Sequence, residues 1–153
     1  MCELSFFNII FDNLYFMIAD QFLGTWELIP YKSTSQYGSI PRSCTYRFSL
    51  AKEPGILQID MEWVDEKGKA FNGDYQIKPD GLGYEADGQN GVDMVMAELR
   101  NPRLLTTAAF YRGEQISFAS REILPDRTMR IIQRGKTPQG VAYENVQYFR
   151  RMR

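Results

Sequence analysis

The chain has 153 residues, which fits one domain of ordinary size, and 44% of them are hydrophobic, enough for a packed core. Wholesale disorder is therefore excluded, and the formal net charge of −1 argues against a nucleic-acid partner. The absence of histidine excludes Ser-His-Asp and Cys-His nucleophile systems, histidine-ligated zinc and proximal-histidine haem.

An N-terminal helical extension is predicted for residues 1–21, ahead of a single domain at residues 22–153. A secretion signal would need a basic start and an uninterrupted apolar core, whereas Glu3 precedes the apolar run and Asp12 interrupts it. The segment is also too short to span a bilayer, so we expect a cytoplasmic protein without a transmembrane segment. The i, i+3, i+4 and i+7 positions of the amphipathic pattern are Phe7, Ile10, Phe11 and Leu14.

Three interpretations of this N-terminal segment stay open. It is a helix packed on the main domain or on a partner chain, a helix lying on a membrane surface, or an extension ahead of a start at Met17. We favour packing on the main domain or on a partner, because little polar surface is left around the apolar stripe.

From residue 22 onward, nine segments have the character of β-strands, and in most of them apolar and polar residues alternate as in half-buried strands. The cleanest alternation places Leu57, Ile59, Met61 and Trp63 on one strand face. Turn sequences rich in glycine, proline and aspartate separate the segments. The predicted strands are 24–29, 44–50, 57–63, 71–77, 92–99, 104–111, 115–124, 128–134 and 141–150.

An all-β fold, an antiparallel up-and-down β-barrel, follows from this spacing. No βαβ unit is present, which excludes a parallel sheet. A twisted sheet of so many strands tends to curl, and closure removes its exposed edges. Residues 104–111 are apolar on both faces, so we expect the N-terminal helix or a dimer interface to cover that strand.

The charge is unevenly distributed along the chain. Residues 1–126 hold 11 basic and 18 acidic side chains, whereas residues 127–153 hold seven basic ones and only Glu144 as an acid. A phosphate- or nucleic-acid-binding tail is one interpretation. We favour acidic early strands lying beside basic late strands, because the arginines are spread through a strand pattern.

The segment Phe22-Leu23-Gly24-Thr25-Trp26-Glu27-Leu28 resembles the opening strand of the lipocalin and fatty-acid-binding barrels, the calycins. The resemblance implies that Gly24 lets the chain bend at the barrel floor and that the indole of Trp26 plugs it. It also implies a cation–π contact from an arginine late in the last strand. Arg150 or Arg151 is placed to make it, and we assign this closing role to Arg150.

A closer resemblance, over most of residues 22–151, is to a group of uncharacterised bacterial lipocalin-like proteins. The residues on which this resemblance rests include Gly24-Thr25-Trp26-x-Leu28, Asp65-Glu66-Lys67-Gly68-Lys69 and Gln139-Gly140-Val141. The chain departs from the fatty-acid-binding proteins, whose Arg-x-Tyr carboxylate clamp would need an arginine at Val146. The resemblance therefore implies a barrel and leaves its activity open.

The predicted function is non-enzymatic binding of a small hydrophobic or amphipathic molecule in the barrel lumen. Arg121, Arg130, Tyr75 and Gln133 are candidates to orient it, although each fits a surface or end-of-barrel position better. The alternative is a filled barrel that acts as a homo-oligomerisation module through the N-terminal segment and residues 104–111. The predicted lumen residues are Tyr46, Phe48, Ile59, Met61, Trp63, Phe71, Tyr75, Met94, Met96, Phe110, Phe118 and Arg130.

An unrecognised enzyme is the third hypothesis. Asp60 and Glu62 share a strand face and could act as an acid–base pair, but their alternation with apolar residues favours exposure to water. Cys44 lies on the apolar face of its strand and has no histidine partner, so we expect a buried structural thiol. With Cys2 and Cys44 as the only cysteines, we expect no metal site and no cofactor.

Overall fold

The computed structural model describes residues 20–88 and 91–152, and it confirms the all-β, antiparallel barrel fold. The predicted N-terminal helix lies, except for its last two residues, outside this range. The 3₁₀ helix η1 is Pro30–Lys32. The strands are β1 (Gly24–Leu28), β2 (Ser43–Leu50), β3 (Leu57–Val64), β4 (Ala70–Ile77), β5 (Asp80–Glu85), β6 (Met94–Asn101), β7 (Leu104–Tyr111), β8 (Glu114–Ile123), β9 (Met129–Lys136) and β10 (Ala142–Arg151).

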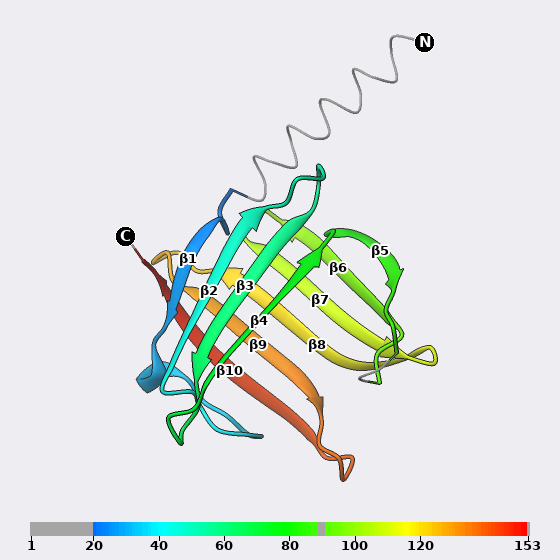
Figure 1. Ribbon diagram of the computed structural model, residues 1–153. Coiled ribbons are helices and arrows are strands. Elements are labelled where there is room, and N and C mark those ends of the chain that lie inside the picture. Colours follow the sequence, from blue (N-terminus) through cyan, green and yellow to red (C-terminus); the bar gives the residue numbers. More distant parts are fainter. Residues whose placement is uncertain (1–19, 89–90, 153) are drawn as a thin grey trace, which may run out of the picture.

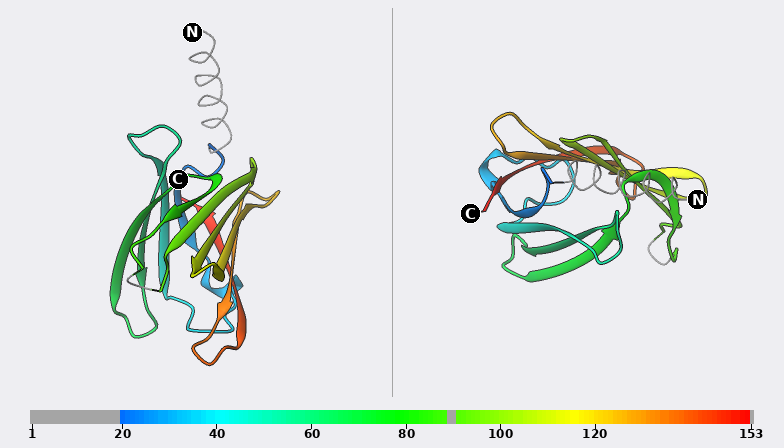
Figure 2. Two further views of the ribbon diagram at one scale, coloured as in Figure 1. Left: turned by 90° about the vertical axis from the view of Figure 1, so that its right-hand side faces the viewer. Right: turned by 90° about the horizontal axis from the view of Figure 1, so that it is seen from above.

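The ten strands form one sheet in the order β4-β3-β2-β1-β10-β9-β8-β7-β6-β5, in which all neighbouring strands run antiparallel (Figure 1). The sheet curls so that β3 and β4 face β6 to β9 across the interior (Figure 2). The predicted closure is incomplete, because β4 and β5 are the two edges of the sheet and do not pair. The barrel therefore has an open seam between these two strands.

The strand β5 was not predicted from the sequence. Its residues include Gly81 and Gly83, and glycine weakens a strand signal because it provides no side chain to pack. Gly81 has a φ of +79°, and the pairing with β6 is irregular between Asp80 and Gly83. This local bulge gives β5 the character of a short edge strand.

One end of the barrel is filled by a tightly packed core. Its largest fully buried side chains come from both ends of the chain, so long-range pairing is needed to assemble it. Cross-strand contacts tie it together: Tyr46 lies edge-on to Phe149 at 5.3 Å between ring centroids. The fully buried residues are Trp26, Phe22, Phe48, Phe149, Leu57, Ile59, Leu105, Met129 and Ile131.

Trp26 closes this filled end. Its indole N–H donates a hydrogen bond of 2.8 Å to the carbonyl of Phe22, and its side chain is fully buried. The guanidinium of Arg151 lies 4.5 Å from the ring centroid and donates to the carbonyls of Gln21 and Leu23. The tryptophan is thus covered by a cation that is itself tied to the incoming chain.

The role assigned to Arg150 needs correction. Successive strand residues point to opposite faces, and Arg150 points outward, where its Nε lies 3.2 Å from a carboxylate oxygen of Glu27. Arg151, one position later, is the residue on the face of Trp26. Gly24 is needed beside it, because its φ is +117° and a Cβ there would lie 3.1 Å from Nη1 of Arg151.

Within residues 20–88 and 91–152, no helix has the length and apolar character needed to cross a membrane.

Three arginines of the basic C-terminal segment, residues 127–153, form ion pairs with glutamates of neighbouring strands. These pairs are Arg130 with Glu122, Arg134 with Glu144 and Arg150 with Glu27.

Candidate ligand-binding site

The inner face of the sheet changes from large to small side chains along the barrel. Residues directly opposite one another on antiparallel strands point to the same side, so the strand register defines rows across β6 to β9. The row nearest the filled end contains Leu99, Leu105, Arg121 and Ile131. The next two rows are Ala97, Thr107, Ala119 and Gln133, and then Val95, Ala109, Ser117 and Gly135.

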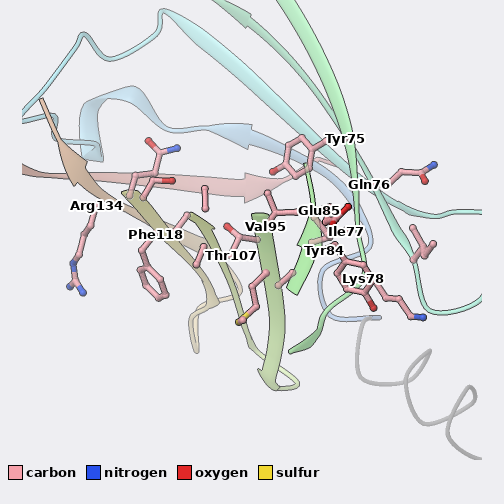
Figure 3. Close-up of a pocket in the computed structure, with 18 of the residues that line it drawn as sticks. Tyr75, Gln76, Ile77, Lys78, Tyr84, Glu85, Val95, Thr107, Phe118 and Arg134 are labelled. Atoms are coloured by element: carbon pink, nitrogen blue, oxygen red, sulfur yellow. The ribbon is translucent and has the colours of Figure 1, made fainter. Parts of the chain in front are cut away.

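These small side chains leave a cavity of about 920 Å³ between the inner wall of β6 to β9 and the two unpaired edges. Tyr75 and Ile77 of β4 and Tyr84 of β5 form its other side. Val95 and Tyr84 are 38% and 37% exposed although they point inward, so the cavity has apolar walls open to solvent. Figure 3 shows Tyr75, Thr107 and Val95 around this space.

A buried arginine lies beside the cavity, on the side of the filled core. The side chain of Arg121 is only 4% exposed. Its Nη2 donates to the hydroxyl oxygen of Tyr75 at 2.9 Å and its Nη1 to the hydroxyl oxygen of Thr107 at 3.1 Å. Both acceptors line the cavity, so Arg121 lies directly behind its polar patch.

The charge of Arg121 also affects the pKa of Tyr46, a core residue. Burial raises the pKa of Tyr46 well above its usual range, and the nearby positive charge of Arg121 opposes that shift. Tyr46 therefore stays a neutral phenol at physiological pH.

The predicted lumen residues of β2, β3 and β4 all lie on the inner face. Alternation and register place them there, but at different levels of the barrel. Trp63 and Phe71 stack at 5.4 Å near the β3–β4 turn, away from the cavity, and Tyr75 lines it. Those at the filled end or beside it are Tyr46, Phe48, Ile59 and Met61.

The predicted lumen residues of β6 to β9 need correction, because the register places them on the outer face. Figure 3 shows the ring of Phe118 and the side chain of Arg134 pointing away from Tyr75. Both faces of β6 and β7 carry apolar side chains, so hydrophobicity could not tell inside from outside, and the bulkier residues Met94, Met96 and Phe110 are outside. The outward-facing residues are Met94, Met96, Phe110, Phe118 and Arg130.

Among these outward residues, Arg130 is held by an ion pair with Glu122 at 2.7 Å. The hydrogen bond to Glu122 raises the pKa of Arg130. Met96 and Phe118 are among the residues that border the cavity, but the register places their side chains on the outer face with Ala108 and Arg134. None of these groups can orient a molecule inside the barrel.

The small residues of the cavity wall were missed by sequence analysis. Ala97, Ala109 and Ala119 carry no polar group and Ser117 is small, so only the recurrence of small residues at every second position signals a shared face. Gln133, a predicted orienting residue, does line the cavity.

The candidate catalytic residues are not assembled into a site. Asp60 and Glu62 alternate with Ile59 and Met61 and therefore face outward, where Asp60 accepts a hydrogen bond from Gln58. Within the part of the chain that the structure describes, no three acidic or cysteine side chains cluster as metal ligands.

Cys44 is buried, and burial raises its pKa from 9.0 to about 11. We expect it to resist iodoacetamide in the folded protein at pH 8, because its thiolate population is roughly a hundredfold lower than that of an unshifted thiol. Peptide mass spectrometry should find Cys44 unmodified in native buffer and modified in guanidinium chloride. Rapid modification in native buffer would contradict the burial of this thiol.

No protein-family model matches this chain, and no curated protein matches it. Solved structures with a similar fold include the following two. One is a redesigned β-barrel, 14% identical, with a TM-score of 0.51 over 90% of this chain and 96% of that one. The other is EF1p2_mFAP2b bound to DFHBI, 12% identical, with a TM-score of 0.52 over 89% of this chain and 98% of that one.

Proposed function

We propose that the chain is a non-enzymatic binding protein for a small, mainly apolar molecule, held in the cavity between the barrel's open seam and β6 to β9. The observation that carries this proposal is the difference in side-chain size between the two ends of one continuous sheet. Large side chains fill the end closed by Trp26, whereas Ala97, Ala109 and Ala119 leave about 920 Å³ at the other. The cavity therefore arises from side-chain size within an intact sheet.

The volume and the lining agree with this function. Ligand sites in proteins are typically apolar cavities of about 300–1,000 Å³ with a few polar groups. Tyr75, Thr107 and Gln133 supply such groups here. The similar barrel that is solved with DFHBI adds support by analogy of fold. The resemblance to the bacterial lipocalin-like group belongs to the same proposal.

The test uses the neutral fluorescent probe N-phenyl-1-naphthylamine. Titration of the folded protein should give a saturable rise in fluorescence with one site per chain, because the probe leaves water for an apolar wall. The same titration in a denaturing concentration of guanidinium chloride should give no saturable signal. A linear, non-saturating response from the folded protein would contradict the proposal.

Self-association is the second candidate function, and the outward-facing Met94, Met96, Phe110 and Phe118 favour it. These apolar side chains gather on the outer face of β6, β7 and β8, where each is partly exposed. Native mass spectrometry separates the two functions. A monomer that gains the mass of the probe supports binding, and a dimer that gains none supports association.

A further inference from the structure

Arg121 is a buried cation that has no acidic partner among the described residues. The ion pairs formed within residues 20–88 and 91–152 use other arginines, and Nε of Arg121 has no hydrogen-bond partner there. A guanidinium stays charged at any pH a protein meets, and burying it without an opposite charge costs free energy. Because the described residues supply no counter-charge, we expect it from a bound anion.

The two groups that Arg121 contacts can carry its charge into the cavity. Arginine only donates hydrogen bonds, so the hydroxyl oxygens of Tyr75 and Thr107 must accept them. Each hydroxyl keeps its own hydrogen, which can be donated to a third group. Because both residues line the cavity, it presents two O–H donors that are polarised by the cation behind them.

A carboxylate matches this arrangement. It is an acceptor-only anion with two oxygens, and hydrogen bonds to an ionised group are roughly twice as strong as neutral ones. Val95, Ala97, Ala109 and Ala119 give the wall of β6 to β8 an apolar surface, and the charged lining residues Glu53, Lys78 and Glu85 come from the β2–β3 turn and from around the seam. The site thus combines one anion-binding end with an apolar channel.

We propose that the cavity binds an amphiphile with a single carboxylate. The carboxylate accepts hydrogen bonds from Tyr75 and Thr107, Arg121 supplies the counter-charge, and the tail lies along the alanine wall of β6 to β8. This inference rests on the proposed function and adds the chemical class of the ligand.

The experiment measures displacement of N-phenyl-1-naphthylamine by decanoate and by decan-1-ol, with acetate as the head group alone. The wild-type protein should release the probe at about tenfold lower decanoate than decan-1-ol, and acetate should not release it. Arg121→Gln should abolish this preference, so that decanoate and decan-1-ol displace the probe at similar concentrations. Tyr75→Phe should reduce the preference in part.

The matched control is Arg130→Gln, which removes the same charge from the outer face of the neighbouring strand. It should keep the wild-type preference for decanoate, because Arg130 is paired with Glu122 outside the barrel. Equal loss of preference in Arg130→Gln and Arg121→Gln would assign the effect to net charge and overturn the inference.

A second readout tests whether Arg121 is only structural. Arg121→Met removes an uncompensated buried charge and keeps an apolar side chain, so the melting temperature without ligand should be unchanged or higher. A lower melting temperature would assign Arg121 a structural role and overturn the inference.

The outcomes separate the two proposals. If the wild-type protein fails to bind N-phenyl-1-naphthylamine, the proposed function is wrong. If the probe binds and decanoate and decan-1-ol displace it equally, the binding function stands and the carboxylate inference alone is wrong.

Discussion

Trp26→Ala should lower the free energy of unfolding by about 3–5 kcal/mol, the range for removal of a large buried aromatic side chain. The indole is fully buried, its N–H is bonded to Phe22, and its face is covered by Arg151. For a chain of this size, the melting temperature should fall by roughly 6–20 °C. Urea denaturation followed by circular dichroism measures the change.

Two neighbouring arginines provide the control for this closure. Arg151→Gln should lower the free energy of unfolding by about 1 kcal/mol, because it removes the cation over Trp26 and the hydrogen bonds to the carbonyls of Gln21 and Leu23. Arg150→Gln removes the same charge from an exposed pair with Glu27 and should cost less than about 0.5 kcal/mol. Equal costs for the two variants would show that the contact with the indole adds nothing to stability.

Ala109→Phe should weaken binding of N-phenyl-1-naphthylamine by more than about tenfold. Ala109 lies on the inner face of β7, and a benzyl group there occupies the space that the probe requires. The melting temperature should change little, because the added ring enters a cavity and not a packed core. Fluorescence titration of the variant beside the wild type measures the loss.

The matched control is the preceding residue of the same strand. Ala108 faces outward with Met96 and Phe118, so Ala108→Phe adds the same ring on the other side of the sheet. Its affinity for the probe should stay within about twofold of wild type. Wild-type affinity in Ala109→Phe would place the probe outside this cavity.

The cavity wall shows where prediction from the sequence ended. The strands β2 and β3 alternate between apolar and polar residues, and their inner faces were predicted correctly. The strands β6 and β7 carry apolar residues on both faces, so a prediction that favours bulky side chains selects the outer face. Arg121 was one of four orienting candidates, and only its burial beside Tyr75 and Thr107 distinguished it from Arg130.

The contact between Arg151 and Trp26 shows the same limit of prediction from the sequence. The Gly-x-Trp segment placed Trp26 and Gly24 at the barrel floor, but a choice between Arg150 and Arg151 depends on the phase of β10 against β1. A shift of one residue moves every side chain to the opposite face. Periodicity alone could not supply that phase at the end of a strand.

The number and direction of the strands were determined by the sequence itself, with the exception of the glycine-containing β5. Alternation and turn chemistry are local, and they act within ten or so residues. The open seam between β4 and β5, the cavity and the unpaired charge of Arg121 were decided only by the tertiary structure. Each depends on which distant strands meet and in what register, and that outcome is set by the packing of the whole sheet.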